Sequence, residues 1–198
     1  MTLALFDFDG TLIRGDSLFG FSRFVVGPFR YSIGLVRIVP HLLLFKLGLL
    51  SATSAKERLL TVYLAGKSIR DLQGKAQAYQ VILRSREIPE TVAALKAHVQ
   101  KGDTVAIVSA SCSLWLKDWC TAHGVSILLT TELAEQDGNV TGKLANANCQ
   151  GLEKARRIQT QWDLQMFEKV VAYGDSRGDK EMLDLAQEAW LRGKKVLG

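Results

Sequence analysis

One stretch near the start of the chain constrains the possible folds more than any other. An apolar run from Leu3 to Phe6 ends abruptly in two carboxylates, Asp7 and Asp9, and a glycine and a threonine follow at once. Because strands buried on both faces are continuous apolar runs, we expect Asp7 where a buried strand emerges at the edge of a parallel sheet. Ligands bind at that edge in open α/β folds, although Asp and Gly are also common in plain turns.

The two carboxylates at one strand end have a chemical implication of their own. Asp7 and Asp9 repel each other unless a cation or a shared proton relieves them. A divalent metal is the simplest relief, and Mg²⁺ is commonly held by one or two carboxylates together with substrate phosphate. The motif therefore favours Mg²⁺ as a cofactor.

The composition is that of an ordinary globular chain. Its 198 residues suffice for one core, or for a core with a modest insert, and 47% are hydrophobic against 23% charged. The formal net charge of +5 is a mild bias toward anionic ligands. No basic cluster interleaved with aromatic residues indicates a nucleic-acid partner.

The cysteines and histidines argue against two classes of site. The three cysteines form no Cys-x-x-Cys pair and cannot all pair internally, which favours a reducing compartment. The histidines are scattered singly, so we expect no zinc site built from histidine. Because no charged-then-apolar leader precedes the first strand, we expect a cytoplasmic protein. The cysteines are Cys112, Cys120 and Cys149, and the histidines are His41, His98 and His123.

Residues 15–86 differ in character from the segments around them. They show no alternating strand pattern, but Leu, Phe, Val and basic residues recur at helical spacing. The pattern predicts a helical cap domain, inserted directly behind the first strand. Breaks are expected at Pro28, at Pro40 and over 48–51, and helices over about 54–64 and 68–84, with Ser54 and Ser68 as N-caps.

The stretch from Tyr31 to Leu50 is the most apolar in the chain. Its length suits a membrane span, but Arg37, Pro40 and Lys46 interrupt it, and central charges are costly in lipid. We therefore expect helices that pack on each other and no stable span. A lipid-facing surface, and with it peripheral membrane contact, stays open as the alternative.

From residue 89 onward, strands alternate with helices. This alternation predicts an α/β fold with a doubly wound parallel sheet, whose core domain comprises residues 1–14 and 87–198. The expected elements are a helix over 89–101, a strand over 104–108, a helix closing near Gly124, a strand over 125–130, a hairpin over 133–144 around Asp137-Gly138, a helix over 151–162, a strand over 169–173 and a helix over 179–187.

Three of the expected strands, over 3–6, 104–108 and 169–173, end in polar clusters. The clusters are Asp7 and Asp9, Ser109 and Ser111, and Asp175 and Asp179. Strand ends in a parallel sheet share one edge, so the clusters can converge on one site if the strand order allows it. Each cluster also has a simpler explanation, because Ser109 can serve as a helix N-cap and Gly174-Asp175 as a plain turn.

Each residue of the convergent site has a chemical role open to it. Asp7 can attack phosphorus as a carboxylate nucleophile, and Asp9 can protonate the departing alkoxide and later deprotonate water. Asp175 can complete a Mg²⁺ site with Asp7. Ser109 offers a hydroxyl and nearby backbone N–H groups to phosphate oxygens. Lys154 adds a fixed positive charge, although a lone lysine in a first helical turn is more often solvated.

The order of these motifs resembles the four signatures of the haloacid dehalogenase-like superfamily. It is most similar to the phosphoserine phosphatase branch, whose helical cap is likewise inserted between the first and second motifs. The expected core is therefore Rossmann-like. The motifs are Asp7-Phe8-Asp9-Gly10-Thr11, then Ser109, then Lys154, then Gly174-Asp175-Ser176-x-x-Asp179.

The resemblance implies a Mg²⁺-dependent phosphomonoester hydrolase with an aspartyl-phosphate intermediate. Asp7 is then the nucleophile and Asp9 the acid/base, which touches the metal through its backbone carbonyl. Asp175 is a metal ligand, and Gly178 stands where many relatives place a polar side chain. The remaining implied roles are phosphate binding by Ser109, by the neighbouring Ala110 and by Lys154, and support from Thr11, Ser176 and Asp179.

The cap is similar to those of two relatives. Asp16, Phe19 and Arg23, with the apolar 31–50 stretch, resemble phosphatidylglycerophosphatase of the same branch. In phosphoserine phosphatases an acidic residue at the position of Asp16 and a cap arginine, here Arg58, grip the amino acid. The expected partner is therefore a small phosphorylated substrate, such as phosphoserine or a phospholipid phosphate.

Other functions compete with this interpretation. A phosphotransferase or mutase would share every motif and differ only in its acceptor. A non-enzymatic phospho-acceptor module could use Asp7 with a metal, but it would need neither the cap nor Asp9. A P-loop kinase is excluded because Thr61 stands where the loop's first glycine is required. A haloacid dehalogenase would need neither Mg²⁺ nor an acid at Asp9.

Overall fold

The structure, a computed structural model, describes residues 1–198 and is built around a six-stranded sheet. The strand order is β3-β2-β1-β6-β7-β8, and all neighbouring pairs are parallel except β7 and β8. The strand of the first motif, β1, therefore lies inside the sheet between β2 and β6. The strands are β1 (Thr2–Phe6), β2 (Thr104–Cys112), β3 (Ile127–Thr131), β6 (Lys169–Gly174), β7 (Glu188–Leu191) and β8 (Lys194–Leu197).

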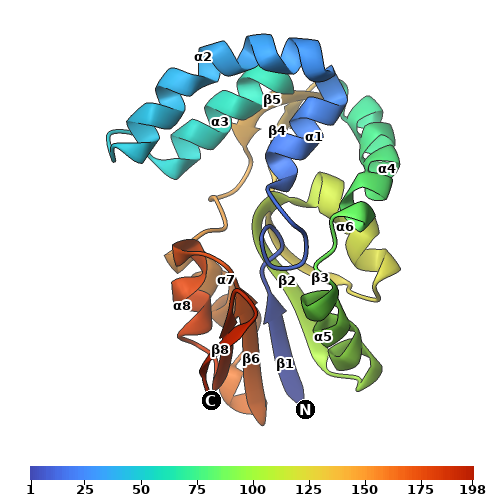
Figure 1. Cartoon of the computed structure of the whole chain (residues 1–198), viewed down its shortest axis with the longest axis vertical. Helices are drawn as coiled ribbons and strands as arrows, with labels where there is room; N and C mark the ends of the chain where they lie inside the picture. The colour runs from blue at the N-terminus through green and yellow to red at the C-terminus, as the bar shows by residue number, and fades with distance from the viewer.

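The sheet is buried on both faces. Along β1, Leu3 and Leu5 belong to one apolar cluster and Ala4 and Phe6 to the other, as the period of two in a strand requires. Helices cover each cluster from outside (Figure 1), which confirms the doubly wound α/β fold. The helices are α5 (Pro89–Gln100) and α6 (Ser113–Ala122) on one face, and α7 (Leu152–Gln161) and α8 (Lys180–Leu183) on the other.

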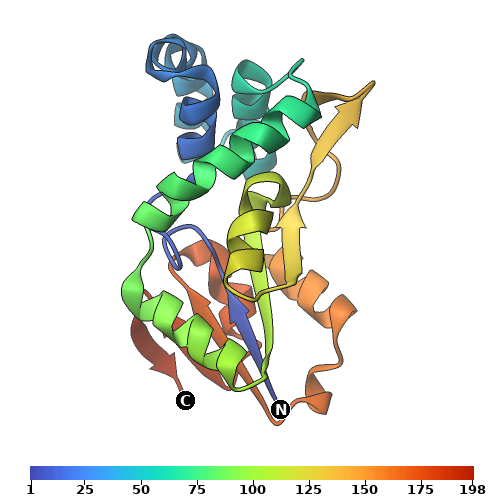
Figure 2. The same cartoon turned by 90° about the vertical axis from the view of Figure 1, so that its right-hand side faces the viewer.

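Four further helices lie beyond the carboxyl ends of the parallel strands (Figure 1). They are α1 (Ser17–Val26), α2 (Pro28–Lys46), α3 (Ala52–Tyr63) and α4 (Ile69–Ser85), and we call them the cap helices. The hairpin of β4 (Leu133–Gln136) and β5 (Asn139–Leu144) packs against α3 beside them (Figure 2). The backbone N–H of Gly66 donates to the carbonyl of Val140 at 2.7 Å, so this hairpin extends the cap.

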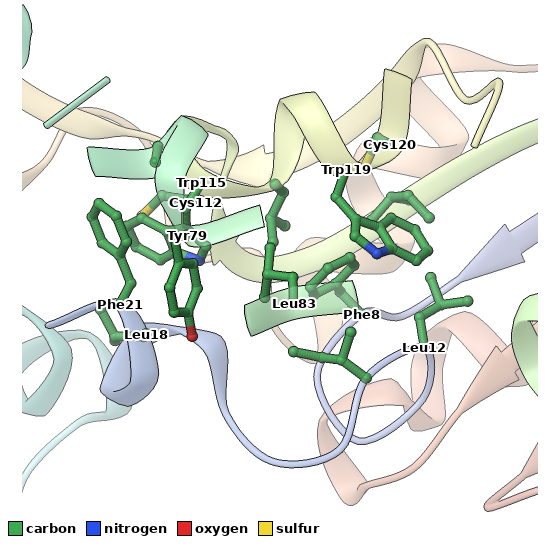
Figure 3. Close-up of a cluster of buried hydrophobic side chains, with 14 of the residues drawn as sticks. Phe8, Leu12, Leu18, Phe21, Tyr79, Leu83, Cys112, Trp115, Trp119 and Cys120 are labelled. Atoms are coloured by element: carbon green, nitrogen blue, oxygen red, sulfur yellow. The ribbon is translucent and has the colours of Figure 1, made fainter. Parts of the chain in front are cut away.

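Buried aromatic side chains join the cap helices to the core (Figure 3). Phe21 of α1 stacks on Trp115 of α6 with ring centroids 5.0 Å apart, and Tyr79 of α4 meets Phe21 at 5.4 Å. Phe8, just after β1, contacts Trp119 edge-on at 5.1 Å. Because these rings belong to one continuous cluster of buried residues, α1 and α4 share the hydrophobic interior of the core.

Two limits of the cap helices differ from those predicted. The expected break at Pro40 is wrong, because α2 continues through it. Pro40 and Val36, whose carbonyl loses its donor, are both exposed, so water can bond to that carbonyl. Helix α3 begins after Ser51 rather than at Ser54, since the Ser51 hydroxyl accepts a hydrogen bond from the Ser54 amide at 3.1 Å. None of the helices combines the length and apolar character that crossing a membrane requires.

In the core, the expected hairpin is present but the C-terminal end differs. Asp137 and Gly138 both have positive φ, which the tight turn of a two-residue hairpin requires. The helix predicted over 179–187 shortens to α8, and the chain then forms β7 and β8, which the sequence pattern did not predict. Strand β2 also runs on to Cys112, so Ser109 lies within a strand.

Two glycines in helix interiors provide a test of cap packing. A Cβ at Gly34 of α2 would lie 2.3 Å from Tyr63 of α3, a buried ring whose hydroxyl donates to the Tyr31 carbonyl at 2.8 Å. We expect Gly34→Ala to lower the free energy of unfolding by about 1–3 kcal/mol through overpacking. Gly74→Ala in α4, where a Cβ meets nothing within 4 Å, should raise it by about 0.5–1 kcal/mol. Denaturant unfolding followed by circular dichroism measures both, and equal effects would contradict the packing of α2 on α3.

Candidate active site

The ends of three neighbouring strands bring the predicted polar clusters together. Phe6 is in register with Ile107 of β2 and with Tyr173 of β6, so the residues that follow these strands emerge side by side. They form the floor of a cavity of about 570 Å³, which the cap helices cover. The floor residues are Asp7, Asp9, Ser109, Lys154, Asp175 and Asp179.

A buried lysine holds two of these carboxylates. Lys154, in the first turn of α7 and 2% exposed, donates to Asp7 Oδ1 and to Asp179 Oδ1, both at 2.6 Å. Burial alone would lower the pKa of Lys154, but the two carboxylates outweigh it and raise that pKa, so the ammonium stays charged. Burial raises the pKa of Asp7 to about 6 in spite of Lys154. The alternative of a solvated helix lysine is therefore wrong for Lys154.

Asp9 is held by a different set of donors. Its carboxylate accepts hydrogen bonds from the Ser17 amide at 2.7 Å, the Ser17 hydroxyl at 3.1 Å and the Ser111 hydroxyl. Trp115 Nε1 in turn donates to Ser17 Oγ at 2.9 Å. Burial, followed by the charge of Asp16, raises the pKa of Asp9 to about 7, so this carboxyl can carry a proton near neutral pH. The sequence did not predict a role for Ser17.

Asp175 offers the least compensated carboxylate of the floor. Burial and the nearby Asp179 raise its pKa. Asp179 is already satisfied by the protein, because its Oδ2 accepts from the amide and the hydroxyl of Ser176, both at 3.0 Å. Carboxylate oxygens of Asp7, Asp175 and Asp179 lie within 4.8 Å of one another. This oxygen-only donor set fits a hard divalent cation.

Two glycines allow the floor to be this compact. A Cβ at Gly10, whose φ is +79°, would lie 2.2 Å from Asp175 Oδ2, and one at Gly174 would lie 2.6 Å from the Cβ of Asp179. Thr11, beside Gly10, donates through Oγ1 to Asp7 Oδ2 at 3.3 Å.

Ser109 and Ala110 line the side of the floor next to Asp7. The Ser109 side chain is buried, and its hydroxyl accepts a hydrogen bond from the Ser111 amide at 3.1 Å. Helix α6 begins four residues after Ser109, with Cys112 at its N-cap position. Ser109 is therefore not a helix N-cap, and the simpler explanation of this serine is wrong.

The cap side of the cavity carries a cation that the sequence analysis missed. Lys56 of α3 lines the cavity, and its Nζ donates to the Ala110 carbonyl at 2.7 Å and to Asn148 Oδ1. Arg58, expected there, is exposed and does not line the cavity. Successive helix residues are about 100° apart, so positions 56 and 58 lie on nearly opposite sides of α3. Lys56 lies one turn before the buried Leu60, and that i, i+4 spacing was the available signal.

Two other expectations, one for Asp16 in the cap and one for Gly178 in the fourth motif, gain a structural explanation. Asp16 lines the cavity mouth and is the N-cap of α1, where its carboxylate accepts from the Phe19 amide at 3.0 Å. A Cβ at Gly178 would lie 3.0 Å from the side chain of Gln150. The Gln150 amide therefore occupies the space that a side chain at position 178 would need, and it lines the cavity itself.

The sheet topology and the acidic cavity floor are those of an α/β enzyme. Within that class, the chain belongs to the haloacid dehalogenase-like hydrolases, whose family model matches residues 4–184. This match confirms the superfamily resemblance drawn from the motifs. The chain is also 32% identical to the protein CicA of Caulobacter vibrioides, over 96% of this chain and 85% of that relative.

Several solved structures share the fold, and two of them illustrate the likeness. A protein of unknown function from Bordetella pertussis Tohama I matches with a TM-score of 0.83 and 24% identity, over 95% of this chain and 88% of that one. A substrate-bound phosphoserine phosphatase matches with a TM-score of 0.70 and 17% identity, over 96% and 84% of the two chains. Both structures cover the cap helices as well as the sheet.

The buried triad of Asp7, Lys154 and Asp179 predicts a large cost for removing its cation. Lys154→Met leaves two buried carboxylates unpaired, which typically costs about 3–5 kcal/mol of unfolding free energy. Lys180→Met removes an exposed pair with Asp184 and should cost at most about 1 kcal/mol. Chemical denaturation in chelator measures both variants.

A third variant separates charge from packing in this test. Asp179→Asn in the Lys154→Met background removes one unpaired charge and should recover part of the lost stability. Equal losses in the two lysine variants, or no recovery in the double variant, would contradict a buried ionic triad.

Proposed function

We propose that this protein is a Mg²⁺-dependent phosphomonoesterase that forms an aspartyl-phosphate intermediate on Asp7. The observation that carries the proposal is the buried pair of Asp7 and Lys154 on the floor of a cavity that also holds Asp9. An aspartate carboxylate is a recognised covalent nucleophile in aspartyl-phosphate enzymes. The shared fold of a phosphoserine phosphatase supports the assignment, with residues 15–86 as a cap domain over a core domain of 1–14 and 87–198.

In the first step, an oxygen of Asp7 bonds to phosphorus as the bond from phosphorus to the leaving oxygen breaks. Asp9 donates its proton to that leaving oxygen. Lys154 keeps Asp7 in place and balances negative charge on the phosphoryl group. The Ser109 hydroxyl and the Ala110 backbone N–H donate hydrogen bonds to phosphoryl oxygens. The products of this step are the free alcohol and the phosphorylated Asp7.

In the second step, Asp9 removes a proton from water, whose oxygen attacks the phosphorus of the acyl phosphate. The bond between Asp7 and phosphorus breaks, inorganic phosphate leaves, and Asp9 is again protonated. Ser17 and Ser111 act as positioning residues in both steps, because they hold the Asp9 carboxylate from one side.

The metal would be held by the carboxylates of Asp7 and Asp175 and by the backbone carbonyl of Asp9. When bound, Mg²⁺ neutralises charge on the nucleophile and on the phosphoryl group. Asp179, Thr11 and Ser176 support these residues through the hydrogen bonds described above.

The cap side of the cavity would select the leaving group. Leu18, Phe19, Leu42 and Phe45 supply apolar contacts and Asp16 supplies a negative charge, whereas Lys56 holds the Ala110 carbonyl beside the phosphate-binding groups. This mixture suits a small phosphorylated substrate with polar and apolar parts, and phosphoserine and phospholipid phosphates are the two to test first. A phosphotransferase or mutase would use the same floor, and phosphate appearing on an added alcohol rather than in solution would indicate one.

The two-step mechanism predicts different defects at the two motif carboxylates. Asp7→Asn should abolish hydrolysis, since it removes the nucleophile. Asp9→Asn should lower kcat by about 10²–10⁴-fold. With an aryl phosphate, whose leaving group needs little protonation, this variant should still release one equivalent of phenol in a burst. Stopped-flow absorbance measures the burst, and chelator should abolish all turnover until Mg²⁺ is restored.

The matched control is Asp118→Asn, which changes an exposed carboxylate of α6 outside the cavity and should leave turnover unchanged. Steady release without a burst in Asp9→Asn would show that Asp9 does not serve the second step. Near-normal hydrolysis by Asp7→Asn would exclude the covalent mechanism.

The cap geometry also predicts that Lys56, and not Arg58, is the basic residue of α3 that affects catalysis. Lys56→Met removes a charge-assisted bond to the Ala110 carbonyl, a type of interaction worth about 1.5–3 kcal/mol. It should therefore lower kcat/KM roughly 10–100-fold on phosphoserine and aryl phosphate alike. Arg58→Met should leave both substrates unaffected. Steady-state kinetics on the two substrates measures the effect of each variant. A larger loss of kcat/KM in Arg58→Met than in Lys56→Met would show that the arginine, and not the lysine, determines activity on these substrates.

A further inference from the structure

Helix α2 presents a second apolar face that nothing in the structure covers. Its inner face packs on α3 through Gly34 and Ile38, which are buried. Nine of the fifteen exposed large hydrophobic residues of the chain lie between residues 29 and 49. Six of them recur at the spacing of one helix face, and we call them the outer stripe: Phe29, Ile33, Val36, Leu43, Leu44 and Leu47.

The exposure of this stripe is extensive. Phe29 is 78% exposed, Val36 75% and Leu47 71%, whereas scattered single apolar residues are normal on a protein surface. In Figure 1, α2 runs along the outer side of the cap, away from the sheet. A continuous apolar stripe in this position is typical of an interaction surface.

The charges beside the stripe indicate what it contacts. No Asp or Glu occurs between Asp16 and Glu57, whereas Arg30, Arg37 and Lys46 all lie on α2. At about 100° per residue, Arg30 and Arg37 fall on one border of the outer stripe. Pairing two copies through this stripe would bring like charges together without a carboxylate on α2 to compensate them.

We propose that the outer stripe of α2 docks on a membrane surface that contains anionic lipids. The helix would lie in the plane of the interface, with the stripe among the acyl chains and the arginines at the headgroups, as basic amphipathic helices do. Leu42 and Phe45, on the inner side of the same helix, line the cavity. Docking would therefore hold the cavity on the opposite side of α2 from the acyl chains, about one helix diameter of 10–12 Å away.

This proposal rests on surface residues outside the catalytic floor, so vesicle binding tests it without any measurement of activity. The full chain is floated with phosphatidylcholine vesicles that contain or lack phosphatidylserine. We expect binding only to the anionic vesicles, weakened by high salt. Arg30→Gln with Arg37→Gln should weaken it by roughly 25-fold, since each basic residue near such a surface contributes about fivefold. Phe29→Ser with Val36→Ser should weaken it on the order of tenfold or more.

Matched variants keep the test specific to α2. Val81→Ser changes an equally exposed residue of α4, and Lys96→Gln with Lys117→Gln removes two exposed charges from core helices; all should bind like the wild type. Asp7→Asn should also bind normally, so a failed phosphatase assay and a failed docking assay are distinguishable. Circular dichroism verifies the fold of each variant.

Three outcomes would overturn the proposal. The first is no binding to anionic vesicles at low salt, and the second is equal binding to zwitterionic vesicles. The third is a stable dimer in sedimentation velocity that Phe29→Ser with Val36→Ser converts to monomer, which would assign the outer stripe to a second copy of the chain.

Discussion

The active-site floor depends on the ion pairs that the buried ammonium of Lys154 makes with Asp7 and Asp179. Asp7, Asp175 and Asp179 come close together where strands end, and carboxylates this near to one another in a low-dielectric site repel strongly. Lys154 offsets that repulsion for two of them and links segments 147 residues apart in sequence. Helix α7 must therefore lie where it does against the sheet, because it carries the charge that the carboxylates need as well as apolar side chains that pack there.

The same floor shows why backbone space matters as much as charge. Gly10 and Gly174 lie where any Cβ would collide with Asp175 or Asp179. The carboxylates can thus approach one another only because the loop after β1 and the last position of β6 lack side chains at the closest points. Charge compensation by Lys154 and close approach at the glycines act together, and neither alone would hold three acids beside the adjacent ends of β1 and β6.

The sequence predicted the core well because its signals are local. The apolar run before Asp7, the Asp137-Gly138 turn and the alternation of strands with helices each follow from nearby residues. The floor residues were predictable because their order along the chain resembles a known family. The convergence of Asp7, Ser109 and Asp175 depended on the order of β2, β1 and β6, which pairing over long distances decides.

The cap was predicted less accurately, for two physical reasons. The choice of Arg58 over Lys56 depends on helix phase, which tertiary packing of Leu59 and Leu60 sets. Pro40 was expected to end a helix, but α2 tolerates it because Pro40 and Val36 lie on its exposed side, where the freed carbonyl is accessible to solvent. Ser17, Asn148 and Gln150 carry no local pattern that distinguishes them from other polar residues, so only the folded chain brings Ser17 to the Asp9 carboxylate and the other two to the cavity.

The attachment of the cap to the core is unequal on its two sides. Beside α1 and α4 the connection is a broad aromatic cluster, whereas beside α3 the bonds from Lys56 to Ala110 and Asn148 bridge directly to the floor. The cavity should therefore widen by rotation of the cap helices about the aromatic cluster. In that movement the bonds from Lys56 to Ala110 and Asn148 would break, so we call Lys56 the latch. An anionic ligand that attracts this ammonium would weaken the latch as it enters, so the arrival of the ligand and the movement of the cap would be coupled through one side chain.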